Sequence, residues 1–314
     1  MAAETVGRPR KKGGAAPLQA WLWRRPWLRS VLLLTPPLAW FVLIYLASLA
    51  LLLVTAFWQI NFFTTQIEQV WNLDNFRTIV SDPTYRLIIG RTVVMAAIVT
   101  VTDAIIAFPF AYYMARVASR RVQTLLFAAV LLPLWASYIA RVYSWILILN
   151  HSGVLNWGLQ SLRLPPADVG YTNVAMWIVF SYIWLPFMII PTYSAMERVP
   201  ESLMEAAADL GARRFRAVRD VVLPLALPGV VAGSIFTFSL TLGDYITPIL
   251  VGGESSGWRS LGLGTGSTFI GNVVYNNVGI ANNVPFAAAL ATIPVAIMAL
   301  YLLGAKRLGA FEAL

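Results

Sequence analysis

The chain has 314 residues, of which 59% are hydrophobic and 12% are charged, about half the charged share of an average soluble domain. This balance indicates a protein whose surface lies largely in lipid, so the net charge of +9 is expected to report membrane topology and not nucleic-acid binding. The lack of cysteine excludes disulfides and thiolate metal sites, and a single histidine, His151, leaves little for metal or acid–base chemistry.

The first 30 residues form a basic tail, and residues 1–17 have the composition of a disordered segment. The first apolar run begins at Val31, and no small-residue cleavage site follows it. We therefore expect a retained first span and not a cleaved signal peptide.

Six segments each contain about 20 or more mostly apolar residues, the length that a helix needs to cross a bilayer. They cover residues 31–58, 88–115, 123–149, 172–195, 225–250 and 284–304. Prolines in several of them predict bent helices. The sequence predicts an all-α transmembrane fold, a six-helix polytopic bundle over residues 31–305, followed by a short C-terminal end at 306–314.

The basic residues are distributed unevenly between the connecting segments. With the N-terminus inside, 17 of the 23 Lys and Arg residues lie in the tail, the 2–3 loop, the 4–5 loop and the C-terminal end. The positive-inside rule then places both termini in the cytoplasm. The outer loops are expected at residues 59–87, 150–171 and 251–283.

The 4–5 loop, residues 197–224, has its own helical pattern. Pro200 is placed as a first-turn proline, an alanine run follows, and Gly211 predicts the end of this helix. A second short helix is expected from about Ala212, and Pro224 is expected to start the fifth span. Two apolar faces are expected, one on each helix: Leu203, Ala207 and Leu210, then Phe215, Val218 and Val222. From the residues alone, this loop is either a docking element or an interfacial amphipathic segment that only satisfies topology.

The segment "EAAADLGARRFRAVRDVVLP" resembles the EAA motif of ABC importer permeases, in type, in spacing and in its position between the fourth and fifth spans. The resemblance implies the type I importer permease fold, of the MetI-like kind, with a coupling helix that docks on a cytoplasmic ABC ATPase dimer. The docking positions that it implies are Glu205, Ala206, Ala207, Gly211, Arg213 and Pro224.

Two further stretches are similar to spermidine/putrescine permeases, and specifically to their B-type subunit. They are "LPLWASYIARVYSWILILNHSGVLNWG" at 132–158 and "SLTLGDYITPILVGG" at 239–253. The resemblance implies a polyamine cargo in a bacterial inner membrane. Other amines, phosphonates and ferric iron are alternative cargoes in the same subfamily.

Three charged residues fall inside the predicted spans, where charges are costly and are functional candidates. Asp244 and Arg141 are expected at similar depth, so Asp244 either lines a path for a cationic cargo or forms a structural ion pair with Arg141. Asp103 is nearer mid-membrane, and we expect a structural role for it, facing a polar cavity or bound to the hydroxyls of Thr100 and Thr102.

Aromatic residues accompany Asp244 in these segments. Tyr245, Trp135 and Tyr138 offer cation–π faces, although ordinary helix packing also accounts for them. Gly243 and Pro248 predict a broken helix beside the carboxylate. The expected substrate path is Asp244, Tyr245, Trp135, Tyr138 and Arg141.

The chain contains no GxxxxGK[ST] phosphate loop, and we expect no catalytic residues, no metal and no cofactor of its own, with ATP used by a separate ATPase subunit. The resemblance implies three further partners: a second six-span permease, with a heterodimer favoured over a homodimer; a periplasmic substrate-binding protein; and the bilayer. There are two rival hypotheses. One is an ion-coupled secondary transporter, which acidic residues inside spans, Asp103 and Asp244, would favour; the other is a membrane anchor without a transport role.

Overall fold

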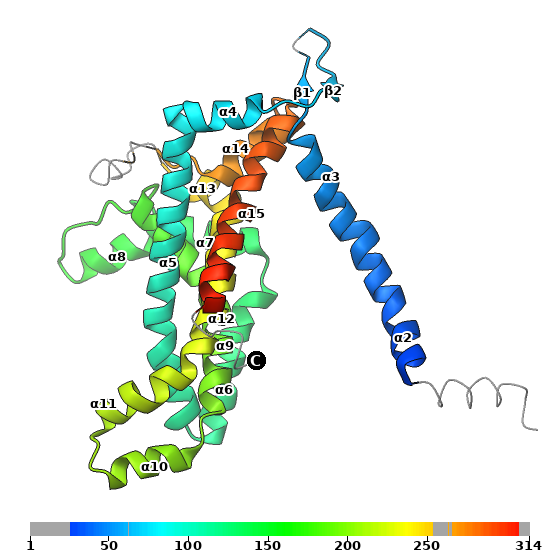
Figure 1. Cartoon of the computed structure of the whole chain (residues 1–314). Helices are drawn as coiled ribbons and strands as arrows, with labels where there is room; N and C mark the ends of the chain where they lie inside the picture. The colour runs from blue at the N-terminus through cyan, green and yellow to red at the C-terminus, as the bar shows by residue number, and fades with distance from the viewer. Residues whose placement is uncertain (1–25, 62, 254–262, 264–265, 308–314) are drawn as a thin grey trace, which may run out of the picture. The chain divides into compact units, whose positions relative to one another are not determined.

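The structure is a computed structural model, and it describes residues 26–61, 63–253, 263 and 266–307 (Figure 1). The expected tail up to residue 25, residues 308–314 and part of the 251–283 loop lie outside this range. The chain divides into two compact units, residues 1–54 and residues 55–314, each described by itself below.

The first unit contains one continuous apolar helix. It comprises α2 (Pro26–Trp40), a π-helical segment η1 (Phe41–Leu46) and α3 (Ala47–Thr55), with two prolines inside α2. The stretch Ser30–Thr55 is long and apolar enough to cross a membrane, and none of it is buried. A helix that is apolar on every side is a membrane span or a buried core helix, and this one has no core around it in its own unit.

The second unit is built on three helices that pack together along their length. These are α5 (Pro83–Arg116), α9 (Asn173–Glu197) and α12 (Leu223–Gly243), which lie side by side in Figure 1, with α15 (Val284–Arg307) against α12. With Ser30–Thr55, the described residues hold five helices long and apolar enough to span a membrane, or six if one bent pair counts as a single span. The expected all-α transmembrane fold is confirmed, apart from one short β-hairpin.

The third predicted span is not straight. Residues 123–149 fall into α6 (Arg120–Trp135) and α7 (Tyr138–Leu149), and α7 with α8 (Val154–Ser161) turns 98° from α6. Ala136 and Ser137 both have extended backbone, with ψ of 147° and 135°, so the hydrogen-bond ladder of α6 stops at this point. Pro133 has already removed one N–H donor from the last turn of α6.

The loop predicted at 59–87 carries structure of its own. Strands β1 (Gln59–Ile60) and β2 (Ile67–Glu68) pair antiparallel, and α4 (Asp74–Ser81) follows. The Asn75 side chain donates to the carbonyls of Ala56 and Trp58, at 3.0 and 2.8 Å. Ile79 of α4 packs with Phe286 of α15, so this loop is fixed to the start of the last helix.

The loop predicted at 251–283 also contains helix. The short α13 (Ile246–Val251) precedes it, and α14 (Ile270–Gly279) lies within it and packs on α15. Both helices lie at the end of the bundle where α5 begins, here named the α14 end; the opposite end is named the α10 end (Figure 1).

Two glycines bring α9 and α12 unusually close. A Cβ on Gly229 would lie 2.6 Å from the carbonyl oxygen of Pro191 and 2.4 Å from the Cβ of Ala195. One on Gly233 would lie 2.8 Å from the sulfur of Met188. These distances leave no room for any side chain, so the two helices meet backbone to backbone.

Candidate functional site

The connection between α9 and α12 is a helical excursion at the α10 end. It consists of α10 (Glu201–Asp209), a turn, α11 (Arg214–Ala217) and the π-helical segment η2 (Val218–Val222), which continues into α12. Pro200 stands at the N-cap of α10 with extended backbone, and Glu201 gives the first turn an acidic residue. Figure 1 shows this excursion projecting beyond the other helices.

The turn after α10 depends on Gly211. Its φ is +78°, a region that side chains disfavour, and its N–H donates to the Ala208 carbonyl at 2.8 Å. The N–H of Ala212 donates to the Ala207 carbonyl at 2.9 Å. This pair of bonds is the Schellman arrangement that ends helices at glycine. A Cβ on Gly211 would meet nothing within 4 Å, so the turn faces open space.

The second helix of this loop differs from the sequence-based expectation. It begins at Arg214, with Arg213 as its N-cap, and not at Ala212. Pro224 does not start a new helix, because the helix runs unbroken from Arg214 to Gly243 through η2. A proline in the first turn of α12 is tolerated here because η2 has already loosened the local ladder.

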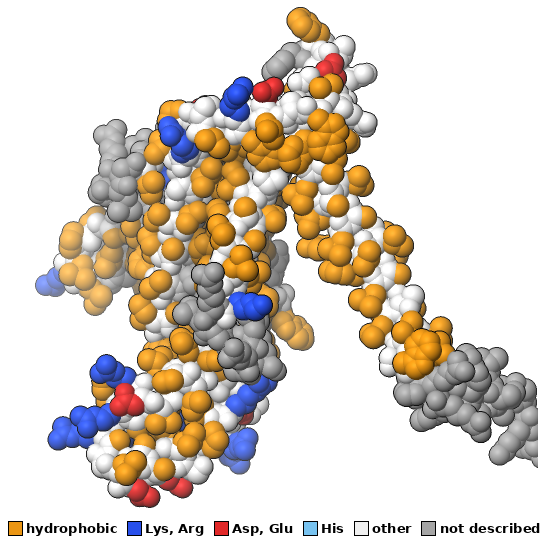
Figure 2. Space-filling view, in the orientation of Figure 1, with side chains coloured by type: hydrophobic (Ala, Val, Ile, Leu, Met, Phe, Trp, Pro, Cys, Tyr) orange, Lys and Arg blue, Asp and Glu red, His pale blue; other side chains and the backbone are white. Residues whose placement is uncertain are grey.

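The two apolar faces expected for this loop are only partly correct. Val218 and Val222 pack, with Met204 of α10, in the apolar cluster that includes Met114 and Met196, but Leu203 is 42%, Leu210 is 90% and Phe215 is 80% exposed. Figure 2 shows charged side chains gathered on the same projection. An exposed leucine and phenylalanine beside charges are typical of a surface that another chain covers.

The structure places the predicted docking residues on this exposed surface. All but one of them are exposed, and Ala207 is half-buried: Glu205, Ala206, Ala207, Gly211, Arg213 and Pro224. Sequence reasoning did not identify Leu210 and Phe215 as surface residues, because their helical spacing suggests a buried face.

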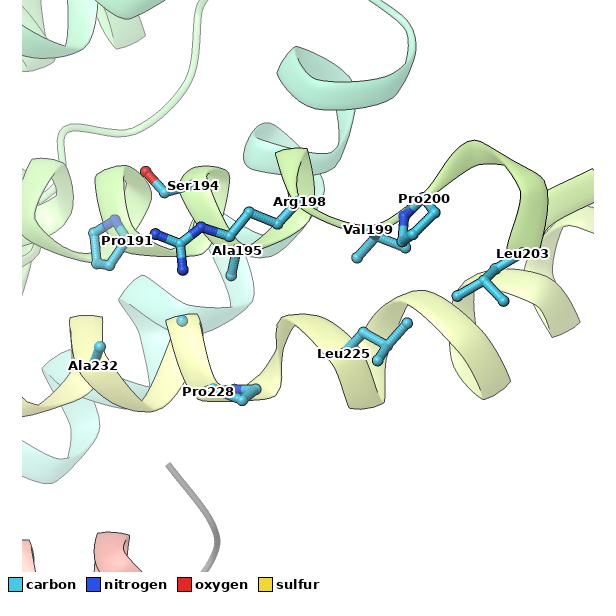
Figure 3. Close-up of a pocket in the computed structure, with 11 residues that line it drawn as sticks. Pro191, Ser194, Ala195, Arg198, Val199, Pro200, Leu203, Leu225, Pro228 and Ala232 are labelled. Atoms are coloured by element: carbon cyan, nitrogen blue, oxygen red, sulfur yellow. The ribbon is translucent and has the colours of Figure 1, made fainter. Parts of the chain in front are cut away.

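A groove of about 430 Å³ lies between the end of α9, the start of α10 and the first turns of α12 (Figure 3). Its walls are mostly apolar, with Pro191 and Ala195 on one side and Pro228 and Ala232 on the other. The Arg198 side chain runs back along the α9 wall in Figure 3.

At the α10 end, the end of α5 and the start of α6 are tied to the end of α9. Nη2 of Arg116 donates to the carbonyl of Met196 at 2.8 Å and also to the carbonyl of Val199. Gln123 of α6 hydrogen-bonds the hydroxyl of Tyr193. These contacts close the bundle immediately before α10 begins.

A second site lies where α12 ends and α13 begins. Residues 244 and 245 break the helix, and the Asp244 carboxylate, 9% exposed, accepts four hydrogen bonds. Its Oδ1 accepts from the N–H groups of Ile246 at 2.8 Å and Thr247 at 3.3 Å. Its Oδ2 accepts from the hydroxyls of Thr247, at 2.9 Å, and Tyr138. The carboxylate therefore caps α13 and joins it to α7.

The α14 helix holds this break in place. A Cβ on Gly271 would lie 2.7 Å from the Asp244 carbonyl oxygen, and Nδ2 of Asn272 donates to the Tyr245 carbonyl at 3.0 Å. Sequence reasoning missed Thr247, Gly271 and Asn272. The segment "DYIT" carries one usable signal, because an aspartate can cap a helix by accepting hydrogen bonds from the N–H groups two and three residues after it.

Arg141 does not form the ion pair that was one of the two readings of Asp244. Within the described part of the chain, no carboxylate lies within 4.0 Å of its guanidinium, and its Nε and Nη1 are buried without a partner. The guanidinium instead lies 5.8 Å from the centre of the Tyr138 ring. Tyr138 is therefore near both the cation and the carboxylate.

The predicted aromatic residues divide into two environments. Tyr138 stacks on Trp184 of α9 at 5.8 Å, and Tyr245 stacks on Tyr275 of α14 at 4.8 Å between ring centres. Trp135 is 90% exposed at the bend between α6 and α7. The structure brings Tyr138 to Asp244 directly and leaves Trp135 outside this network.

Asp103 is fully buried within α5, and neither carboxylate oxygen has a hydrogen-bond partner among the described residues. The threonine hydroxyls expected to bind it are used elsewhere: Thr100 donates to the Ala96 carbonyl, and Thr102 accepts from the Trp177 indole. Ser181 of α9 is close enough to interact with the carboxyl electrostatically, but not in hydrogen-bonding geometry.

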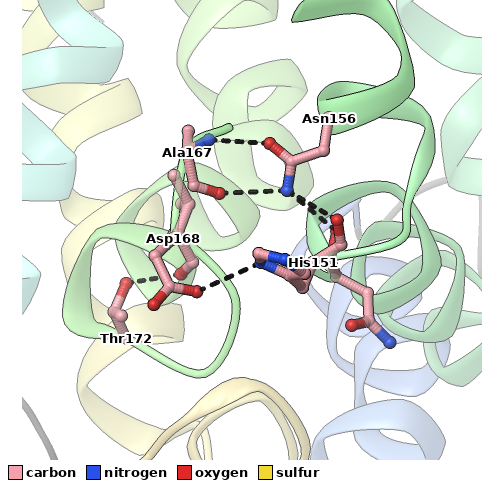
Figure 4. A network of polar contacts seen from close by, with 7 residues as sticks. His151, Asn156, Ala167, Asp168 and Thr172 are labelled. Carbon is pink, nitrogen blue, oxygen red and sulfur yellow. Dashed lines mark hydrogen bonds and ion pairs between the residues drawn. The ribbon is translucent and has the colours of Figure 1, made fainter. Parts of the chain in front are cut away.

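His151 belongs to an exposed network in the loop between α7 and α9 (Figure 4). Its Nδ1 lies 3.8 Å from Oδ1 of Asp168, and both side chains are exposed. The loop is held by Asn156, which donates to the His151 carbonyl at 2.9 Å and exchanges two hydrogen bonds with the backbone of Ala167. Among the described residues, no group of three or more His, Cys, Asp or Glu could hold a metal ion.

Residues 107–308 match the family described as "Binding-protein-dependent transport system inner membrane component". The chain is also 43% identical to the inner membrane ABC transporter permease protein YdcU of Escherichia coli, over 327 aligned residues that cover 100% of both chains. The chain belongs to this permease family. It is thus a multi-pass inner-membrane subunit of an ABC importer, a transport component and not itself an enzyme.

One further relative and one solved structure are similar to this chain. The permease is 32% identical to the spermidine/putrescine transport system permease protein PotB of Haemophilus influenzae, over 76% of this chain and 77% of that one. A bacterial ABC transporter involved in alginate import has the same fold, with a TM-score of 0.71 at 18% identity, over 93% of this chain and 97% of that one.

Proposed function

We propose that this permease forms half of the path through which an ATP-driven importer carries a polyamine such as putrescine or spermidine. Its 32% identity to a spermidine/putrescine permease over three quarters of the chain supports this cargo. The observation that carries the proposal is the Asp244 carboxylate, which is enclosed within the bundle and is bound by uncharged donors only. Hydrogen bonds from neutral groups favour the charged form of the carboxyl without neutralising it, and a negative charge in low dielectric attracts an amine.

The proposed path runs along the α12–α13 break and the α6–α7 bend. Asp244 supplies the charge, Tyr138 and Tyr245 supply aromatic faces, Trp135 stands exposed at the bend, and Arg141 limits how strongly the site holds a cation. Broken helices at such a position also present free backbone carbonyls, which favour cations.

The proposed orientation places the α10 end in the cytoplasm, as the excess of Lys and Arg there favours. The coupling surface is then α10 with its turn, where an ABC ATPase dimer would contact Glu205, Ala206 and Gly211. The exposed side chains of Leu210 and Phe215 give this surface an apolar centre with a charged rim, as protein interfaces have. No cofactor is assigned to this chain, and the ATPase subunits use the ATP.

The proposed assembly has two six-span permeases, preferably this chain with a different one, and a periplasmic substrate-binding protein on the α14 side. One permease can supply only part of the wall of a path.

The test is ATP-dependent uptake of labelled putrescine and spermidine by the full complex in proteoliposomes, with wild type and Asp244→Asn compared. Asparagine keeps the shape and removes the charge, so we expect uptake to fall about tenfold or more with assembly intact, the scale of a lost charge-assisted contact. Uptake of neither amine by wild type would refute the cargo. Normal uptake by Asp244→Asn would reduce Asp244 to a helix cap.

A further inference from the structure

Arg116 makes a contact that neither the docking surface nor the substrate path accounts for. It is the last residue of α5, and its guanidinium reaches two backbone carbonyls that lie about 80 residues further along the chain, those of Met196 and Val199. Met196 is in the last turn of α9, and Val199 comes directly before Pro200, which caps α10. Arg116 thus joins the end of one span to the point where the chain enters α10.

The chemistry of this contact is specific. The last carbonyls of a helix have no partner within that helix, and a cation at this end also interacts favourably with the helix dipole. Both hydrogen bonds come from one nitrogen, Nη2, whose two N–H groups are fixed in the guanidinium plane, so they hold the two carbonyls at defined angles, which a freely rotating lysine ammonium does less well. Val199 is 5% exposed, so its carbonyl sits in a largely dry environment where a hydrogen bond is stronger.

A second contact between α10 and the bundle is less directional. Met204 of α10 packs in the same apolar cluster as Met114, Met196 and Val222. Methionine contacts adapt to small shifts because the side chain is unbranched and polarisable. An apolar contact of this kind keeps α10 in place and allows it to slide, whereas the Arg116 hydrogen bonds fix a distance.

We infer that Arg116 is a positioning residue for energy coupling: it fixes the beginning of α10 to the end of α5, so that a displacement of α10 is transmitted to α5. The inference rests on the proposed function, in which an ATPase docks on α10. Without Arg116, α10 would still dock, but its movement would be taken up at residues 197–200.

The test compares Arg116→Gln and Arg116→Lys with Arg121→Gln in the reconstituted complex. Arg121 is an exposed arginine of α6 near the same end, which makes its substitution a matched control. Three quantities are measured: association with the ATPase, ATP hydrolysis, and uptake per ATP hydrolysed. We expect association and hydrolysis to stay near wild type, and uptake per ATP to fall about tenfold in Arg116→Gln, a typical size for coupling between sites. Arg116→Lys should fall less, and Arg121→Gln should not change.

The inference would be overturned if uptake per ATP in Arg116→Gln equals that of wild type, whether uptake and hydrolysis both fall or both stay normal. If Arg116→Gln fails to assemble, Arg116→Lys provides the test, because it keeps the positive charge and loses the planar guanidinium. Normal uptake per ATP in Arg116→Lys would then overturn the inference. A wild-type chain that binds no ATPase would refute the proposed function and not the contact.

A second measurement addresses the contact without any ATPase. The chain lacks cysteine, so spin labels can be placed on Val117→Cys and Glu201→Cys, two exposed positions on either side of the contact, in the full-length permease in nanodiscs. We expect Arg116→Gln to broaden the distance distribution between the labels. An unchanged distribution would show that Arg116 does not fix this distance.

Discussion

The loop at the α10 end and the break at Asp244 both place polar residues next to apolar helices, but they use those residues in opposite ways. At the loop, Glu205, Gly211 and Arg213 are exposed, and the turn is closed by backbone hydrogen bonds alone. At the break, the side chain of Asp244 is enclosed and makes all four of its hydrogen bonds within the chain. The comparison teaches that substitutions at the loop should affect partners first, while substitutions at the break should affect the fold and transport together.

The largest expected effect is on stability at the break. Asp244→Ala leaves two N–H groups and two hydroxyls without their acceptor, and we expect the permease to lose about 3 kcal/mol of unfolding free energy. Asp244→Asn keeps one acceptor oxygen and should lose less than half of that. Thermal unfolding of the detergent-solubilised chain measures both. Equal stability of wild type and Asp244→Ala would remove the contrast between the two regions.

At the loop, substitutions of Gly211 can separate the effect of the turn's backbone conformation from the effect of a side chain on the exposed surface. Asparagine tolerates a positive φ, so Gly211→Asn should keep the turn while placing a side chain on the exposed surface. We expect its affinity for the ATPase to fall about tenfold, or roughly 1.4 kcal/mol, with little change in thermal stability. Gly211→Ala tests the opposite case, a small side chain with about 1 kcal/mol of backbone strain. Pull-down of the ATPase at a series of concentrations compares the affinity of each variant with that of wild type. Normal binding by Gly211→Asn would exclude this turn from the docking surface.

A smaller effect is expected from Tyr138→Phe, which keeps the ring on Trp184 and removes the hydroxyl that donates to Asp244. The expected loss is about 1 kcal/mol of stability, the usual net value of one hydrogen bond. Tyr143→Phe is the control, because Tyr143 is an exposed tyrosine of the same helix. The same loss in both variants would mean that the Tyr138 hydroxyl contributes nothing through Asp244.

The smallest effect concerns the β1–β2 hairpin, an exposed region with internal side-chain bonds. Hydrogen bonds from Asn61, at 2.7 Å, and Gln59 hold the pKa of Glu68 below its ordinary value of 4.5. A lowered pKa means that the carboxylate stabilises the hairpin above pH 4.5, and that this contribution is lost as pH falls through the lowered value. Amide-exchange protection of residues 59–60 and 67–68 should therefore decline in acid in wild type and stay flat in Glu68→Gln. A decline of the same size in both would assign it to other groups.

The sequence predicted the loop better than the break, for a physical reason. The signals of the loop are local: a proline at the start of α10, an alanine run and a glycine at the left-handed position. The prediction of buried faces was wrong for Leu210 and Phe215, because helical spacing cannot distinguish a side chain that faces the bundle from one that stays exposed.

At the break, the relevant contacts come from distant segments. Depth along two spans suggested Arg141 as a partner for Asp244, but α7 brings Tyr138, and not Arg141, to the carboxylate. The bend at Ala136–Ser137, which sets the direction of α7, carries no strong turn residue besides the nearby Pro133. Asp103 was placed correctly within a span, but its surroundings follow from the packing of α5 on α9, which no local pattern encodes.

The close approach of α9 and α12 at Gly229 and Gly233 has a consequence for how this permease changes shape. Atoms already at contact distance leave no slack for shear, and separation would open an empty slot along both helices. The pair should therefore travel as one rigid body during the transport cycle, with the flexing left to the bend before α7 and to the break before α13.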